Sequence, residues 1–237
     1  MLRKRKLFIK NIICNRYKTI KIVVPITDLY SIHTKYYPLS QVSNSKLINC
    51  NENGYYSFIQ TDRYGFNNDD SIWRSEQIDI LLIGDSFIFG SCVNKVDDIA
   101  SSITTFSKRT TLNLSQNGFG PLSEYAVLRE FYPKNTKNIF WFYFEGNDLD
   151  DLNSELFNPT LSNYVNDINY SQNLKEKTSV TNYLNNDVLI NYSKKENFKK
   201  IKKIIKLTSV RQIFSSTSQK DNKNSLLQFK KIITNAN

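Results

Sequence analysis

The sequence predicts an α/β fold, with a mainly parallel sheet flanked by helices. Three apolar runs, at residues 78–83, 110–114 and 138–144, have the length and composition of buried strands. Two stretches with helical spacing, residues 97–106 and 122–131, lie between them. Strand–helix–strand order with short connections is typical of βαβ units, which build parallel sheets.

Each predicted strand is identified by its side chains and by what ends it. Residues 78–83 (IDILLI) are almost all apolar and stop at Gly84, as expected of a strand buried on both faces. Residues 110–114 predict a short second strand, and residues 138–144 (NIFWFYF) predict a third buried strand. We expect a helix to open at Ser86. Functional groups in such sheets gather beyond the carboxyl ends of the strands.

The pattern divides the chain into three parts. Residues 1–77 form an N-terminal extension leading into the domain, with β-prone pieces at 19–26 and 55–60 among turn-forming Asn, Asp and Ser residues. Residues 78–157 form the core. Residues 158–237 are polar and helix-prone, and we expect a lid or insertion there.

Basic side chains gather outside the predicted core. The net charge is +10, and residues 1–27 carry basic but no acidic groups. Residues 194–206 are rich in lysine and overlap a predicted amphipathic helix at 197–214, which a last helix at 225–236 follows. The core is net acidic, and no nucleic-acid recognition motif occurs. The charge therefore indicates a solvated face or loose membrane-surface affinity rather than nucleic-acid binding.

The cysteines and the single histidine predict no covalent or metal framework. Cys14, Cys50 and Cys92 form no CxxC and no cluster with His33, so we expect neither a disulfide framework nor a zinc site. No apolar run approaches the roughly 20 residues that cross a bilayer. No small-residue cleavage site follows the basic N-terminus, so no signal peptide is expected. The compartment stays open.

Ser86 is the candidate nucleophile, within GDSFIFG at residues 84–90. A serine hydroxyl needs a base to take its proton and donors that stabilise the oxyanion. A position just beyond a buried strand holds the serine rigidly. Ile88 occupies the place of the second glycine in G-x-S-x-G, so the α/β-hydrolase elbow does not fit. By itself the motif is equally compatible with an ordinary helix cap.

The next two strand ends offer hydrogen-bond donors. Gly118 lies in a turn where a backbone N–H can approach an oxyanion, and Asn147 has a short side chain with an NH₂ donor. Alternatively, both are ordinary turn residues. The nearby Asp148, Asp150 and Asp151 are expected to be solvated helix-start charge rather than a metal site.

Ser86, Gly118 and Asn147 lie about thirty residues apart, one at each of three successive strand ends. This arrangement resembles the SGNH/GDSL hydrolase family, whose first blocks are a GDS nucleophile, an N-x-x-x-x-G glycine and a G-x-N-D asparagine. The matching residues are Gly84-Asp85-Ser86, Asn113 with Gly118, and Glu145-Gly146-Asn147-Asp148, where Glu145 replaces the family's first glycine.

The sequence is most similar to a bacterial group of uncharacterised SGNH-like proteins. The similarity lies in residues 61–68, 143–149, 161–164 and 171–174, and covers roughly residues 55–180. It implies a three-layer, flavodoxin-like fold. It also implies that Ser86 is the nucleophile and that its own N–H, the Gly118 N–H and the Asn147 side chain form the oxyanion hole.

The family's fourth block, D-x-x-H, supplies the base and is absent from this sequence. His33 lies upstream of the first core strand and is expected to be a surface or loop histidine. The chain is thus a piece of a longer protein, a catalytically dead relative, or an enzyme with another base. We favour the first, because residues 232–237 resemble the helix before the family's next strand, and without that strand one sheet edge is uncovered.

The resemblance implies hydrolysis of carboxylic esters, such as O-acyl groups of glycans or lipids, through an acyl-Ser86 intermediate. It implies no metal or organic cofactor. The alternatives are an O-acyltransferase acting on cell-envelope glycans and a non-catalytic module that binds polysaccharide or a partner. We expect little esterase activity from a chain without the base. Substrate and oligomeric state are open.

Overall fold

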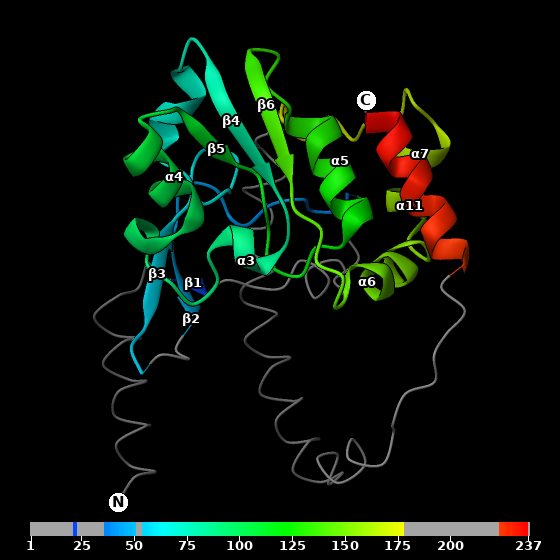
Figure 1. The fold of residues 1–237 in the computed structure, drawn as a ribbon, viewed down its shortest axis with the longest axis horizontal. Coiled ribbons are helices and arrows are strands. Elements are labelled where there is room, and N and C mark those ends of the chain that lie inside the picture. The colour runs from blue at the N-terminus through cyan, green and yellow to red at the C-terminus, as the bar shows by residue number, and fades with distance from the viewer. Residues whose placement is uncertain (1–20, 23–35, 51–53, 178–222, 237) are drawn as a thin grey trace, which may run out of the picture.

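The computed structural model describes residues 21–22, 36–50, 54–177 and 223–236. This part of the chain contains two three-stranded sheets and a set of helices (Figure 1). The predicted α/β class is confirmed at this level.

The core sheet is parallel, as predicted. It consists of β4 (Ile78–Ile83), β5 (Thr111–Asn113) and β6 (Thr136–Trp141), in the order β5-β4-β6. Helices α4 (Ile99–Ser107) and α5 (Pro121–Phe131) make the two crossovers that parallel neighbours require. β4 has the predicted bounds, and each helix predicted within the described residues is present and begins within two residues of its expected start.

Alternate side chains of β4 pack on opposite faces of the sheet. Leu81 and Ile83 belong to the main core with α5 residues, whereas Leu82 packs with Ala100 of α4 and with Ile88. All five of these side chains are buried. The nearly continuous apolar run that predicts β4 is therefore explained by helices on both sides of the sheet.

The third strand departs from the prediction of a buried strand over 138–144. β6 ends at Trp141 and lies at the edge of the sheet, with Ile139 41% and Phe140 50% exposed. Among the described residues, no strand pairs with its outer edge. Composition identifies β6 as a strand, but strand order decides its burial, and the apolar pattern does not specify strand order.

The second sheet is small and packs against the turn that follows β4. β1 (Lys21–Ile22) pairs with β2 (Lys46–Cys50), which pairs antiparallel with β3 (Ser57–Gln60). Leu47 and Ile59 of this sheet form a buried cluster with Phe89 of α3 (Ser86–Phe89).

Short 3-10 helices connect the two sheets to their neighbours. η1 (Asp70–Arg74) leads into β4, and η2 (Lys95–Asp97) precedes α4. Asp98 caps α4, because its side chain accepts a hydrogen bond from the Ser101 N–H at 2.6 Å.

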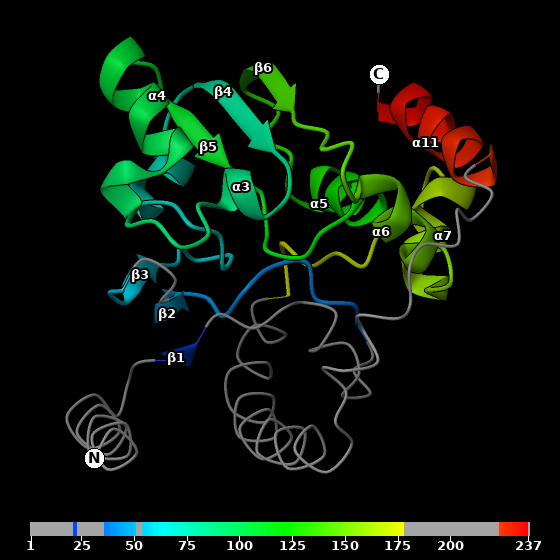
Figure 2. The same cartoon turned by 60° about the horizontal axis from the view of Figure 1, so that its bottom comes forward.

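The remaining helices pack around α5. They are α6 (Asp148–Glu155), α7 (Pro159–Asn166) and α11 (Lys223–Ala236). Figure 2 shows them together on one side of the core sheet. The predicted last helix is present as α11, whereas the predicted helix at 197–214 lies outside the described residues. No helix within the described ranges is long and apolar enough to cross a bilayer.

Candidate active site

The chain turns sharply between β4 and α3, and this turn positions Ser86. Asp85 caps α3, because its Oδ1 accepts the Phe87 N–H at 2.9 Å. A Cβ on Gly84 would lie 2.7 Å from the Ile88 side chain, so only glycine fits this close approach. Ser86 is half-buried at the first position of the helix, as the sequence predicts.

Ser86 lines a hollow of about 780 Å³ at the carboxyl edge of the core sheet. The walls come from the α3 turn, from the end of β2 at Asn49 and Cys50, and from Asn117 beyond β5. Figure 1 shows α3 and α6 at this same edge, beyond the ends of the strand arrows. Space for a ligand and the candidate nucleophile therefore coincide.

The Ser86 hydroxyl has no hydrogen-bond partner among the described residues. His33, the only histidine, lies outside them. Within the described ranges, no group is therefore placed to take the proton of Ser86.

The second strand end is held beside the Ser86 turn, since the Gln116 N–H donates to the Gly84 carbonyl at 3.3 Å. Gly118 is exposed, with φ +80°, a conformation that favours glycine. Its N–H has no acceptor among the described residues. Asn117, rather than Gly118, forms part of the wall of the hollow.

The third strand end approaches Ser86 through aromatic side chains. The rings of Phe87 and Phe144 lie 5.6 Å apart. Asn147 precedes α6 and is exposed, and its Nδ2 donates to Asp151 Oδ2 at 2.6 Å. The structure therefore places all three predicted residues at one edge of the sheet, but the Asn147 amide is bonded to Asp151 and does not line the hollow.

Asn113, which the sequence indicates only as part of the family's second block, is a positioning residue that holds the second strand end in place. Its Nδ2 donates to the Ile88 carbonyl at 2.6 Å, and its Oδ1 accepts the Ser115 N–H at 2.9 Å. Its backbone pairs with the side chain of Asn68. Asn113 thus ties β5 to α3 and to the loop before η1.

The loop at residues 61–68, noted only through the resemblance, is a buried scaffold under this edge. Asp62 Oδ1 accepts the N–H groups of Tyr64 and Phe66, while its Oδ2 accepts from Asn68 and from the Trp73 indole. Burial raises the pKa of Asp62 although these donors oppose the shift. The only sequence signal for this network is the resemblance of residues 61–68.

Three buried carboxyl groups lie between α5 and α6. Glu155 caps α5 by accepting the N–H groups of Gly120 and Leu122, each at 2.9 Å. Burial raises the pKa of Glu155 to about 7, that of Asp148 to about 6, and that of Glu124 well above its usual range. No group of three or more His, Cys, Asp or Glu side chains in the described ranges could hold a metal ion.

Cys50 and Cys92 form a disulfide, contrary to the expectation from the sequence. The two cysteines are 42 residues apart and belong to no spacing motif, so the sequence does not indicate that they meet. They meet because β2 packs against the α3 turn. The disulfide lines the same hollow as Ser86.

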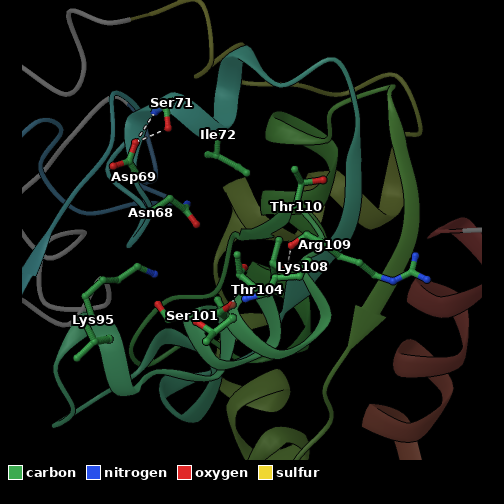
Figure 3. A pocket seen from close by; sticks show the side chains of 14 residues that line it. Asn68, Asp69, Ser71, Ile72, Lys95, Ser101, Thr104, Lys108, Arg109 and Thr110 are labelled. Atoms are coloured by element: carbon green, nitrogen blue, oxygen red, sulfur yellow. Dashed lines mark hydrogen bonds between the residues drawn. The ribbon is translucent and has the colours of Figure 1, made fainter.

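A second hollow, of about 680 Å³, lies between η1, η2 and α4 (Figure 3). Its polar lining is mostly hydroxyl groups. Lys95 donates to Asp98 and to the Asn67 carbonyl, each at 2.8 Å, and Figure 3 shows the Arg109 guanidinium turned away. Its serine–carboxylate contact, between Ser71 and Asp69, belongs to the cap of η1. The hollow at Ser86 lies instead at the carboxyl edge of the core sheet, where ligands of parallel sheets bind, and it is therefore the candidate active site.

Fold and site together define an α/β protein with a half-buried serine at the carboxyl edge of a parallel sheet. No protein-family model, curated protein or solved structure matches this chain. The function proposed for the site therefore rests on its own residues.

Proposed function

We propose that this chain provides the nucleophile side of a serine ester hydrolase of the SGNH/GDSL type. The observation that carries the proposal is the position of Ser86, half-buried in the wall of a hollow at the carboxyl edge of the sheet. Ligands of parallel α/β sheets bind at that edge. The proposal includes the three-layer arrangement, which the packing of β4 against helices on both faces supports.

The proposed chemistry is acyl transfer to Ser86 followed by hydrolysis. The Ser86 oxygen attacks the ester carbonyl, the alcohol leaves, and water then cleaves the acyl-serine to a free acid. Among the described residues, the Ser86 and Gly118 N–H groups have no acceptor, so both can donate to the oxyanion. Asn147 does not line the hollow and donates one of its two amide hydrogens to Asp151, so we expect its side chain to turn toward the hollow when substrate binds.

A non-catalytic binding module is the second candidate, and one observation favours it. The Ser86 hydroxyl has no base among the described residues. A serine without a base reacts slowly, so the hollow would then bind an ester or glycan without cleaving it.

Hydrolysis of a small aryl ester with and without added imidazole separates the two candidates. Imidazole serves as the missing base, so an enzyme site gives hydrolysis that depends on Ser86 and rises with imidazole concentration. Ser86→Ala is the test variant, and Ser91→Ala is the matched control, since Ser91 lines the same hollow. Equal rates for both variants and the parent at every imidazole concentration would refute the hydrolase and leave the binding module.

A further inference from the structure

The turn after α3 is tied to the small sheet at three points. Phe89 packs with Leu47 and Ile59 in a buried cluster. The Asn49 side chain donates to the Gly90 carbonyl at 2.8 Å. The residue after Asn49 forms the disulfide with Cys92.

These ties reach Ser86 through the backbone. The Ser91 N–H donates to the Ser86 carbonyl at 2.9 Å, so the turn that Cys92 anchors holds the residue carrying the candidate nucleophile. Cys92 has φ +65°, a left-handed backbone conformation that residues other than glycine rarely adopt. Such a conformation persists only where its surroundings hold it, and the disulfide is the covalent part of those surroundings.

The disulfide is also placed where a reductant can reach it. Both cysteines are only partly buried, and both line the hollow that contains Ser86. A bond buried in the main core would be protected from thiols, whereas this one faces the space into which a ligand would enter.

We propose that the Cys50–Cys92 disulfide is a redox-sensitive brace that positions Ser86. In its oxidised form it fixes the turn at residues 90–92. A dithiol reductant opens it in two steps. One thiolate of the reductant attacks a cysteine sulfur to form a mixed disulfide, and the second thiol of the reductant then displaces the remaining cysteine as a thiolate. The products are an oxidised cyclic disulfide and two cysteine thiols, and the turn loses its covalent tie to the small sheet while it keeps the Asn49 bond and the apolar packing.

The brace is tested by hydrogen exchange on the full chain carrying Cys14→Ser, so that Cys50 and Cys92 are its only cysteines. With dithiothreitol as the reductant, we expect amide exchange in peptides over residues 86–93 to rise by at least about tenfold, while α5 peptides keep their rates. The Cys50→Ser/Cys92→Ser variant should exchange like the reduced chain and ignore dithiothreitol. Unchanged exchange over 86–93 on reduction would overturn the brace.

The consequence for Ser86 rests on the proposed function and has its own readout. In the presence of imidazole as the added base, we expect a fluorophosphonate probe to label Ser86 more slowly in the reduced chain, by about tenfold. Equal labelling in both states would overturn the positioning role. If reduction raises exchange but neither state is labelled, the brace stands and the hydrolase proposal fails, so the two failures are distinguishable.

Discussion

The buried carboxyl groups beside α5 make stability depend on pH, and Glu155 shows the effect most clearly. It is 7% exposed and accepts backbone N–H groups at the start of α5. Those donors favour the ionised form, but burial outweighs them and raises the pKa of Glu155 from 4.5 to about 7.

The sign follows from the protons that each state binds. Between about pH 4.5 and 7 the folded chain holds a proton on Glu155 that the unfolded chain has lost, so stability falls as pH rises through this window. One pKa unit corresponds to about 1.4 kcal/mol, so the full penalty is about 3 kcal/mol. Most of it, roughly 2–3 kcal/mol, falls between pH 5 and pH 8. The raised pKa of Asp148 adds to the same trend.

Urea unfolding followed by circular dichroism at pH 5 and pH 8 measures this loss. We expect the parent chain to be less stable at pH 8. Glu155→Gln should lose about 2–3 kcal/mol less between the two pH values, because glutamine does not ionise. Asp150→Asn, at an exposed carboxyl of the same helix, should keep the parent slope. Equal or higher stability of the parent at pH 8 would refute the reasoning.

Three further predictions concern the supports of the site and the sheet. Asn113→Ala leaves a buried carbonyl and a buried N–H without their partners, so it should lower the free energy of unfolding, measured in urea, by about 3 kcal/mol. Asn117→Ala, the control, should change it by under about 0.5 kcal/mol. Equal effects of the two variants would contradict the role of Asn113. Cys50→Ser removes a disulfide that joins residues 42 positions apart, so it should lower the free energy of unfolding by about 4 kcal/mol in the same assay. A loss under about 1 kcal/mol would show that the disulfide does not stabilise the fold. Phe140→Lys, at a half-exposed side chain of β6, should leave the free energy of unfolding within about 0.5 kcal/mol of the parent value. Leu82→Ala, in the buried part of β4, should lower it by about 2–5 kcal/mol. A large loss from Phe140→Lys would contradict its exposure.

Local pattern was enough to predict the core of the fold. The sequence predicts strand 78–83 and helix 122–131, and the structure has β4 at Ile78–Ile83 and α5 at Pro121–Phe131. A near-continuous apolar run that ends at Gly84 predicts the strand, and the helical spacing of apolar residues predicts the helix. The position of Ser86 follows from the same strand end, so its place at the sheet edge was also predictable.

What the sequence did not predict depends on contacts between distant residues. The exposure of Phe140 follows from strand order, and the disulfide of Cys50 with Cys92 follows from the packing of β2 on the α3 turn. The bond of Asn147 to Asp151 is a choice of rotamer that a motif does not specify. The buried network around Asp62 likewise joins residues whose partners lie on different elements.

The central claim is that Ser86 is a nucleophile poised at the hollow, and covalent trapping tests it most directly. The folded chain is treated with a fluorophosphonate in the presence of imidazole, and the modified peptide is identified by mass spectrometry. The account predicts one adduct on Ser86 that forms faster as imidazole increases, is lost in Ser86→Ala, persists in Ser91→Ala and is absent from the urea-unfolded chain. Labelling that is unchanged in Ser86→Ala, or no adduct at any imidazole concentration, would contradict it.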